Sequence, residues 1–142
     1  MNRKDAFFAA LSGTLLVLIF PRLNLWVLAW AALVPLLAAA DGKDCAAGFK
    51  LGWVAGTIFH AGLVYWVTVS MTLYGKLPFA VSIPILLVFA ACLGLFTGLP
   101  IWGACFVQQR RGWSFSITLP FLWVAVEHLK SWFLTGFPWD LI

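Results

Sequence analysis

The sequence has 142 residues, of which 63 % are hydrophobic and only 10 % are charged, and nine are tryptophan. Because soluble domains carry roughly 25 % charged residues, this composition excludes an ordinary water-soluble globule and predicts an integral membrane protein. The net charge of +4 comes from basic residues that stand singly or in pairs between apolar runs. This scatter argues against a nucleic-acid-binding stripe and is typical of residues that set the orientation of membrane helices.

Five apolar segments predict an all-α fold, a bundle of about five transmembrane helices. A helix needs roughly 20 residues to cross a hydrocarbon core, and the first two segments are shorter than that. The first segment follows Arg3 and Lys4 but runs into Pro21 without a small-residue cleavage site. It is therefore predicted to be a retained helix rather than a signal peptide. The predicted helices cover residues 6–20, 25–40, 51–73, 80–107 and 115–134.

Prolines divide or limit several of these segments. Pro21 and Asn24 predict a tight turn between the first two helices, which would form an antiparallel hairpin. The fourth segment is longer than a single span requires. Pro84 and Pro100 therefore predict a late start, a kink or an early end within it.

The distribution of lysine and arginine predicts the orientation of the bundle. With a cytoplasmic N-terminus, most of the basic residues lie on the cytoplasmic side, as the positive-inside rule requires. Residues 135–142 then begin a periplasmic loop. The cytoplasmic set is Arg3, Lys4, Lys43, Lys50, Arg110 and Arg111, and the set on or near the outer side is Arg22, Lys76 and Lys130.

Small residues recur at helical spacing in the third and fourth segments. Glycines at this spacing let two membrane helices approach closely, so that dispersion contacts hold them together. Helix packing is the favoured interpretation, and a groove for lipid is the alternative. The glycines concerned are Gly48, Gly52 and Gly56 in one stripe and Gly94 and Gly98 in a second.

Four ionisable side chains lie within apolar segments: His60, Glu127, His128 and Lys130. Such residues are costly in hydrocarbon, so each is a functional candidate. Glu127 and Lys130 are three positions apart and share one face of a helix. They form either an interior pair that fixes helix packing or the border of a site where a lipid headgroup or a partner domain docks. His60 is interpreted as a packing histidine.

The sequence predicts no metal site, no cofactor and no catalytic set. Cys45 lies in a predicted loop, whereas Cys92 and Cys105 lie in an apolar run. This spacing matches neither a metal site nor a disulfide framework. No serine or cysteine stands at a readable spacing from an acid and a base.

Three stretches, in this order and spacing, resemble the front of the bacterial apolipoprotein N-acyltransferases. The first is "FPRLNLWVLAWAALVPLL", residues 20–37, which is similar to the entry of that family's second helix. The second is "GLVYWVTVSMTLYGKLP", residues 62–78, with a Tyr-Trp helix end and an aromatic-Gly-x-Leu-Pro turn. The third is "LWVAVEHLKSWFLTGFPW", residues 122–139, which resembles the family's Leu-Trp, Glu, basic residue, Trp and Thr-Gly-Phe-Pro-Trp run.

The resemblance implies that the chemistry lies outside this chain. Family members carry further membrane helices and a periplasmic nitrilase-like domain, in which a glutamate base activates a cysteine nucleophile and a lysine stabilises the oxyanion. The cysteine takes an acyl chain from a phospholipid and passes it to the diacylglyceryl-cysteine of a lipoprotein. That domain is absent here, so none of its catalytic residues is carried over. Phospholipid, the lipoprotein and the missing domain are the expected partners.

The resemblance also implies candidate residues at the end of the chain that face lipid or the missing domain. The sequence departs from the family pattern near them, with His128, Lys130 and Ser131 where Trp, Arg and Gly are common. A lysine grips a phosphate or carboxylate less specifically than a bidentate arginine. The candidate set is Glu127, Lys130, Gly136, Phe137, Pro138 and Trp139.

The expected function is therefore that of the N-terminal membrane domain, residues 1–142, of an apolipoprotein N-acyltransferase in a bacterial inner membrane. By itself this multi-pass part is expected to be inactive. One alternative is a complete small membrane protein without enzymatic activity, such as a transporter or an assembly subunit. Another is fusion to a different enzyme, such as a glycosyltransferase.

Overall fold

Every regular element that the computed structural model describes, within residues 2–19 and 25–133, is a helix. The all-helical part of the sequence prediction is thus confirmed for these residues. The elements are α1 (Arg3–Ile19), the 3-10 helix η1 (Trp26–Trp30), α2 (Val34–Ala40), α3 (Cys45–Leu63), α4 (Trp66–Leu73), α5 (Phe79–Arg111) and α6 (Phe115–Phe133).

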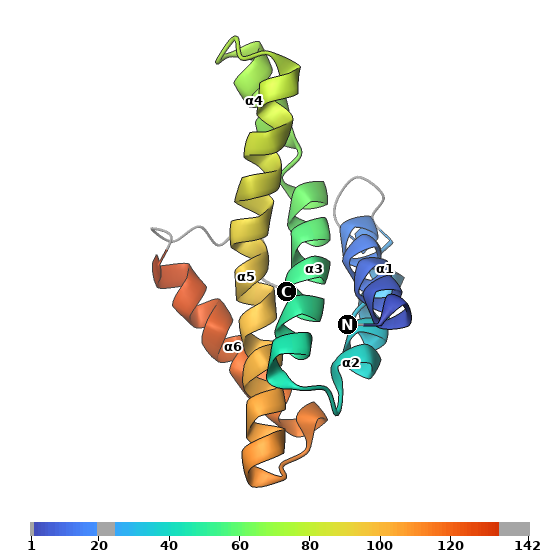
Figure 1. The fold of residues 1–142 in the computed structure, drawn as a ribbon. Coiled ribbons are helices and arrows are strands. Elements are labelled where there is room, and N and C mark those ends of the chain that lie inside the picture. The colour runs from blue at the N-terminus through green and yellow to red at the C-terminus, as the bar shows by residue number, and fades with distance from the viewer. Residues whose placement is uncertain (1, 20–24, 134–142) are drawn as a thin grey trace.

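Helices α3 and α5 lie side by side in the centre and run in opposite directions (Figure 1). Helix α1 packs on the far side of α3 together with α2, and α6 leans across the C-terminal half of α5. The N-terminal part of α5 and helix α4 extend beyond the other helices at one end (Figure 1). The largest group of buried apolar side chains joins α1, α2, α3, α5 and α6.

The predicted second helix, 25–40, is divided in the structure into η1 and α2. Pro35 favours the restart, because a proline is best tolerated in the first turn of a helix, and it stands there in α2. The Ser12 hydroxyl then accepts a hydrogen bond of 2.8 Å from the buried Leu36 N–H. Helix α2 is thereby fastened to α1.

The predicted third helix, 51–73, starts earlier and is broken. The Asp44 carboxylate accepts a hydrogen bond from the Ala47 N–H and caps α3, so the helix includes residues that the sequence prediction left in a loop. Helices α3 and α4 are separated at Val64 and Tyr65 and bend by 49°. Valine and tyrosine are modest helix formers, which favours a break at this point.

Helix α5 is longer than predicted rather than divided. It continues through both of its prolines for 33 residues. A proline costs a helix one hydrogen bond, but membrane helices tolerate it where neighbouring segments hold the backbone. Pro100 is buried between Gly98 and Ile101, which both contact α3. Helix α5 ends at Gly112, whose φ of 68° is the left-handed conformation of a glycine C-cap.

Among the described residues, α5 is the one helix that is long and apolar enough to cross a membrane by itself. Helices α3 and α4 reach that length only if they form one bent span, and the stretch from Trp26 to Ala40 is apolar but shorter. The structure therefore provides one or two candidate spans by length and composition, fewer than the five that the sequence predicts.

Candidate functional site

The two charged residues predicted to act as a pair lie together on α6. The Lys130 Nζ is 3.9 Å from the Glu127 Oε2, one helical turn away. The Lys130 side chain is 2 % exposed and that of Glu127 is 18 % exposed. A charge in such a position is costly unless it is paired, and the two side chains are close enough to form that pair.

The neighbouring residues of the predicted site are only partly described. His128 is exposed on α6, and its ring lies 6.2 Å from that of Trp132 between centroids. The Ser131 hydroxyl donates to the His128 carbonyl oxygen at 2.6 Å. Gly136, Phe137, Pro138 and Trp139 lie outside the described residues.

The five glycines of the two stripes lie where α3 and α5 meet. A Cβ atom added to Gly52 would come within 2.9 Å of the Gly98 Cα and the Thr97 carbonyl oxygen, which belong to the backbone of α5. One added to Gly94 would come within 2.8 Å of the Thr57 backbone nitrogen on α3. At Gly48 and Gly56, an added Cβ would first meet side chains of α5, those of Cys105 and Thr97. The two backbones are therefore closer than any side chain would allow.

A side-chain hydrogen bond that the sequence did not indicate reinforces this contact. The Trp53 indole Nε1–H donates across the helix pair to the Ala91 carbonyl oxygen at 2.8 Å. Within α3 itself, the Nδ1 of the buried His60 lies 2.6 Å from the Gly56 carbonyl oxygen, one turn earlier. A tryptophan inside an apolar segment gives no signal in the sequence that its N–H will reach another helix.

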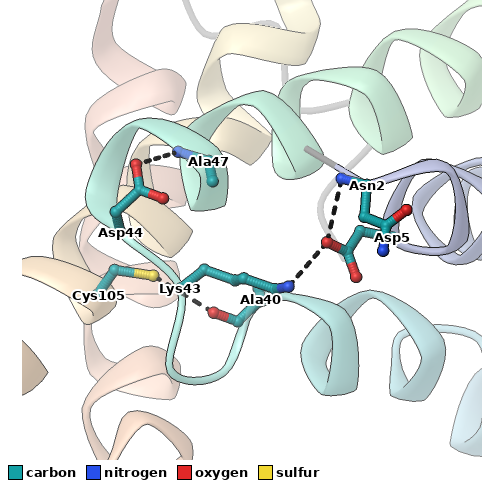
Figure 2. A network of polar contacts seen from close by, with 7 residues as sticks. All are labelled: Asn2, Asp5, Ala40, Lys43, Asp44, Ala47 and Cys105. Atoms are coloured by element: carbon teal, nitrogen blue, oxygen red, sulfur yellow. Dashed lines mark hydrogen bonds and ion pairs between the residues drawn. The ribbon is translucent and has the colours of Figure 1, made fainter.

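A second polar cluster, also missed, surrounds the turn of residues 41–44 between α2 and α3. From the C-terminal end of α5, the Gln108 Nε2 donates to the Asp41 Oδ1 at 2.8 Å and the Gln109 Nε2 donates to the Lys43 carbonyl oxygen at 3.0 Å. The Cys105 thiol donates to the Ala40 carbonyl oxygen at 3.6 Å (Figure 2). Helix α5 thus holds this turn by three side chains.

The same turn is joined to α1 by an ion pair. The Lys43 Nζ donates to the Asp5 Oδ2 at 2.8 Å, and the Asn2 N–H donates to the same oxygen (Figure 2). The Lys43 hydrogen bond is the main cause that lowers the pKa of Asp5 below its usual value of 3.8. The pair therefore contributes stability above that pH, and the contribution is lost as the pH falls through the lowered pKa.

The three cysteines occupy unrelated positions. Cys45 is half-buried with its thiol 3.4 Å from the Gln109 Oε1, Cys92 is exposed on α5, and Cys105 is buried. All three are free thiols. Within the described ranges, no group of three histidine, cysteine or acidic side chains could hold a metal ion. The described residues can pack, pair and anchor, but they assemble no nucleophile with a base.

Apolar grooves lie on both flanks of α6. One, of about 460 Å³, runs along α5 from Phe89 to Leu99 and is closed by Leu129 of α6. The other, of about 310 Å³, lies between Leu33 and Leu37 on one side and Leu119 and Trp123 on the other. Both are lined almost wholly by apolar atoms, as a surface in contact with acyl chains would be.

The chain is similar to bacterial apolipoprotein N-acyltransferases. Residues 12–142 match the sequence model of the apolipoprotein N-acyltransferase N-terminal domain. The chain is 42 % identical over 139 residues to the apolipoprotein N-acyltransferase of Geobacter metallireducens. The matched residues cover 96 % of this chain and 26 % of that protein.

Two further relatives carry the same name. The apolipoprotein N-acyltransferase of Chromobacterium violaceum is 33 % identical over 134 residues, covering 92 % of this chain and 25 % of that protein. That of Pseudomonas paraeruginosa is 31 % identical over 134 residues, covering 92 % of this chain and 26 % of that protein. The chain therefore spans about a quarter of the length of these relatives, and it belongs to the apolipoprotein N-acyltransferase family, of which it represents the N-terminal domain.

Proposed function

We propose that this chain is the membrane-embedded part of an enzyme that transfers an acyl chain from a phospholipid to the N-terminal diacylglyceryl-cysteine of lipoproteins. The observation that carries the proposal is the match of residues 12–142 to the N-terminal domain of the family. The relatives are named apolipoprotein N-acyltransferase, and this chain covers about a quarter of each. The reaction itself is then the work of a nitrilase-like domain outside residues 1–142.

The proposed setting is a bacterial inner membrane, crossed by about five helices with the N-terminus on the cytoplasmic side. Support comes from the length of α5 and from the many large apolar side chains that point outward from α4, α5 and α6. In water such a surface would be strongly unfavourable, whereas in lipid it costs nothing. Support also comes from Arg110 and Arg111 at one end of α5, since basic residues concentrate on the cytoplasmic side.

Glu127 and Lys130 are proposed to border the place where a lipid headgroup or the catalytic domain meets the helices, together with Gly136, Phe137, Pro138 and Trp139. The buried pair on α6 supports this role, because an ionisable residue inside a membrane domain is costly and is kept for a purpose. The grooves on both flanks of α6 offer surfaces along which acyl chains could approach.

Cys45, Cys92 and Cys105 are proposed to take no part in the acyl transfer. Cys105 donates into the α2–α5 contact, and Cys92 lies exposed on α5. A thiol becomes a nucleophile only when a neighbouring base or positive field generates its thiolate. Residues 1–142 alone should accordingly be inactive.

An acyl-transfer assay with phospholipid vesicles and a diacylglyceryl-cysteine peptide tests the proposal. The protein made from its native gene should acylate the peptide, and so should its variant with Cys45→Ala, Cys92→Ala and Cys105→Ala. Residues 1–142 made separately should give no product above background. Activity in that fragment, or loss of activity in the triple variant, would contradict the proposed division of labour. A membrane-inserted native product with no activity would favour a non-enzymatic membrane protein.

A further inference from the structure

A groove with a basic rim lies between α3 and α5 near the C-terminal end of α5, on a surface to which the proposed function gives no role. The groove measures about 330 Å³ and is lined by Ala46, Phe49 and Lys50 of α3 and by Leu99 and Trp102 of α5. Lys50, Leu99 and Trp102 are exposed, so the groove is open to the surroundings along its length.

Aromatic rings extend this groove toward the end of α5. The Trp102 and Phe106 rings stack, with their centroids 5.6 Å apart and their planes inclined by 16°. The Arg110 guanidinium carbon lies over the Phe106 ring, 5.6 Å from its centroid. An apolar, aromatic floor therefore leads from the groove to a cation that already rests on its last ring.

Lys50 and Arg110 stand at two places along this aromatic floor. Lys50 lines the groove together with Leu99 and Trp102. Arg110 lies over Phe106, whose ring stacks on that of Trp102. Because α3 and α5 are antiparallel (Figure 1), the N-terminal part of α3, which carries Lys50, packs beside the C-terminal half of α5, which carries Arg110.

The carboxylates at this end of the molecule are engaged elsewhere. Asp5 pairs with Lys43, Asp41 accepts from Gln108, and Asp44 caps α3. Within residues 2–19 and 25–133, none of them forms an ion pair with Lys50 or Arg110. The rim of the groove is therefore positive and fits an anion.

The position of the groove along α5 selects the kind of anion. Helix α5 has 33 residues, or about 50 Å at about 1.5 Å per residue, whereas a hydrocarbon core is about 30 Å thick. The end that carries Arg110 and Arg111 therefore reaches the headgroup region. A ligand held here has a phosphate between two cations and an apolar chain along the groove below.

We propose that this groove binds an anionic phospholipid of the cytoplasmic leaflet, with its phosphate between Lys50 and Arg110 and one acyl chain along Phe49, Leu99 and Trp102. The proposal rests on the membrane placement proposed above. The occupant is a structural lipid rather than the acyl donor, because the groove lies at the end of α5 opposite to the side on which the acyl transfer is proposed.

Spin-labelled lipids test the site in the protein made from its native gene and reconstituted in nanodiscs. Labelled phosphatidylglycerol should associate with the protein more strongly than labelled phosphatidylcholine. The double variant Lys50→Gln/Arg110→Gln should reduce this preference by about thirtyfold, since each basic residue near a membrane surface contributes about a fivefold attraction. The variant Lys50→Arg/Arg110→Lys should keep the preference, because both charges remain.

The matched control is Lys76→Gln/Arg111→Gln, which removes two exposed charges outside the groove. It should leave the preference for phosphatidylglycerol nearly unchanged. An equal loss in the control, or no loss in Lys50→Gln/Arg110→Gln with an unaltered melting temperature, would overturn the proposal. So would displacement of the labelled lipid by glycerol 3-phosphate as effectively as by phosphatidylglycerol, because the groove would then contribute nothing. Acyl-transfer activity is measured separately, so failure here leaves the proposed function standing.

Discussion

Replacing Gly52 with leucine is expected to destabilise the protein by about 3 kcal/mol, since overpacking a close helix contact usually costs about 1–3 kcal/mol and a leucine is large. The Cβ of any residue at this position would meet the α5 backbone at Gly98 and Thr97, which cannot rotate aside. The helices would have to separate, and the indole hydrogen bond from Trp53 to Ala91 would be lost as well. Thermal or denaturant-induced unfolding in bicelles measures the loss.

Alanine substitutions at two glycines provide the control. Gly103, also on α5, faces only the flexible end of the Leu122 side chain, which would lie 3.0 Å from an added Cβ. Alanine gains about 1 kcal/mol in helix propensity over glycine, so Gly103→Ala should be neutral or slightly stabilising. Gly52→Ala should be clearly destabilising despite the same gain. Equal effects at the two positions would show that the close approach of α3 and α5 is not what makes Gly52 necessary.

Replacing Lys130 with methionine is expected to cost about 3 kcal/mol, because it removes the ammonium that the mostly buried Glu127 carboxylate faces. Glu127→Gln alone should also be destabilising, since it removes the carboxylate that the buried ammonium faces. The double variant Glu127→Gln/Lys130→Met should recover most of the loss, because both charges of the pair are then removed together. Together with that of the unsubstituted protein, the three unfolding free energies form a double-mutant cycle.

The expected coupling energy between Glu127 and Lys130 is about 1–3 kcal/mol. Ser131→Ala serves as the neighbouring control, because its hydroxyl bonds only within α6 at the His128 carbonyl oxygen. That variant should change stability by less than about 1 kcal/mol. A coupling near zero would mean that the 3.9 Å approach of the two groups makes no contribution to folding.

The parts of the fold that the sequence predicted are those that depend on local composition. Long apolar runs indicated where each helical segment lies, with outer ends within about six residues of the observed ones, but not the breaks inside 25–40 and 51–73. The division of 25–40 depends on the preference of Pro35 for a first turn, and the early start of α3 depends on the Asp44 cap. Both signals are present in the sequence, but a prediction that relies on hydropathy alone does not use them.

The features that the sequence did not predict depend on pairs of residues brought together by the fold. Gln108 and Gln109 lie more than 60 positions from the turn that they hold, and their role appears only once α5 stands beside α3. Continuation of α5 through Pro100 likewise depends on contact with α3 rather than on the residues around the proline. Lys50 and Trp102 line one groove for the same reason.

The most direct test is membrane topology. The central claim is that this domain is a multi-span bundle with its N-terminus in the cytoplasm. The measurement is labelling by a membrane-impermeant thiol reagent, which is applied either to the periplasmic or to the cytoplasmic side of the inner membrane. Single-cysteine proteins would carry the native Cys45, or Lys76→Cys, or Arg111→Cys, with the other cysteines changed to alanine. Cys45 lies beside Gln109 at one end of α5, and Lys76 precedes its other end. Cys45 and position 111 should be labelled only from the cytoplasm, and position 76 only from the periplasm. Labelling of all three from one side would contradict the claim.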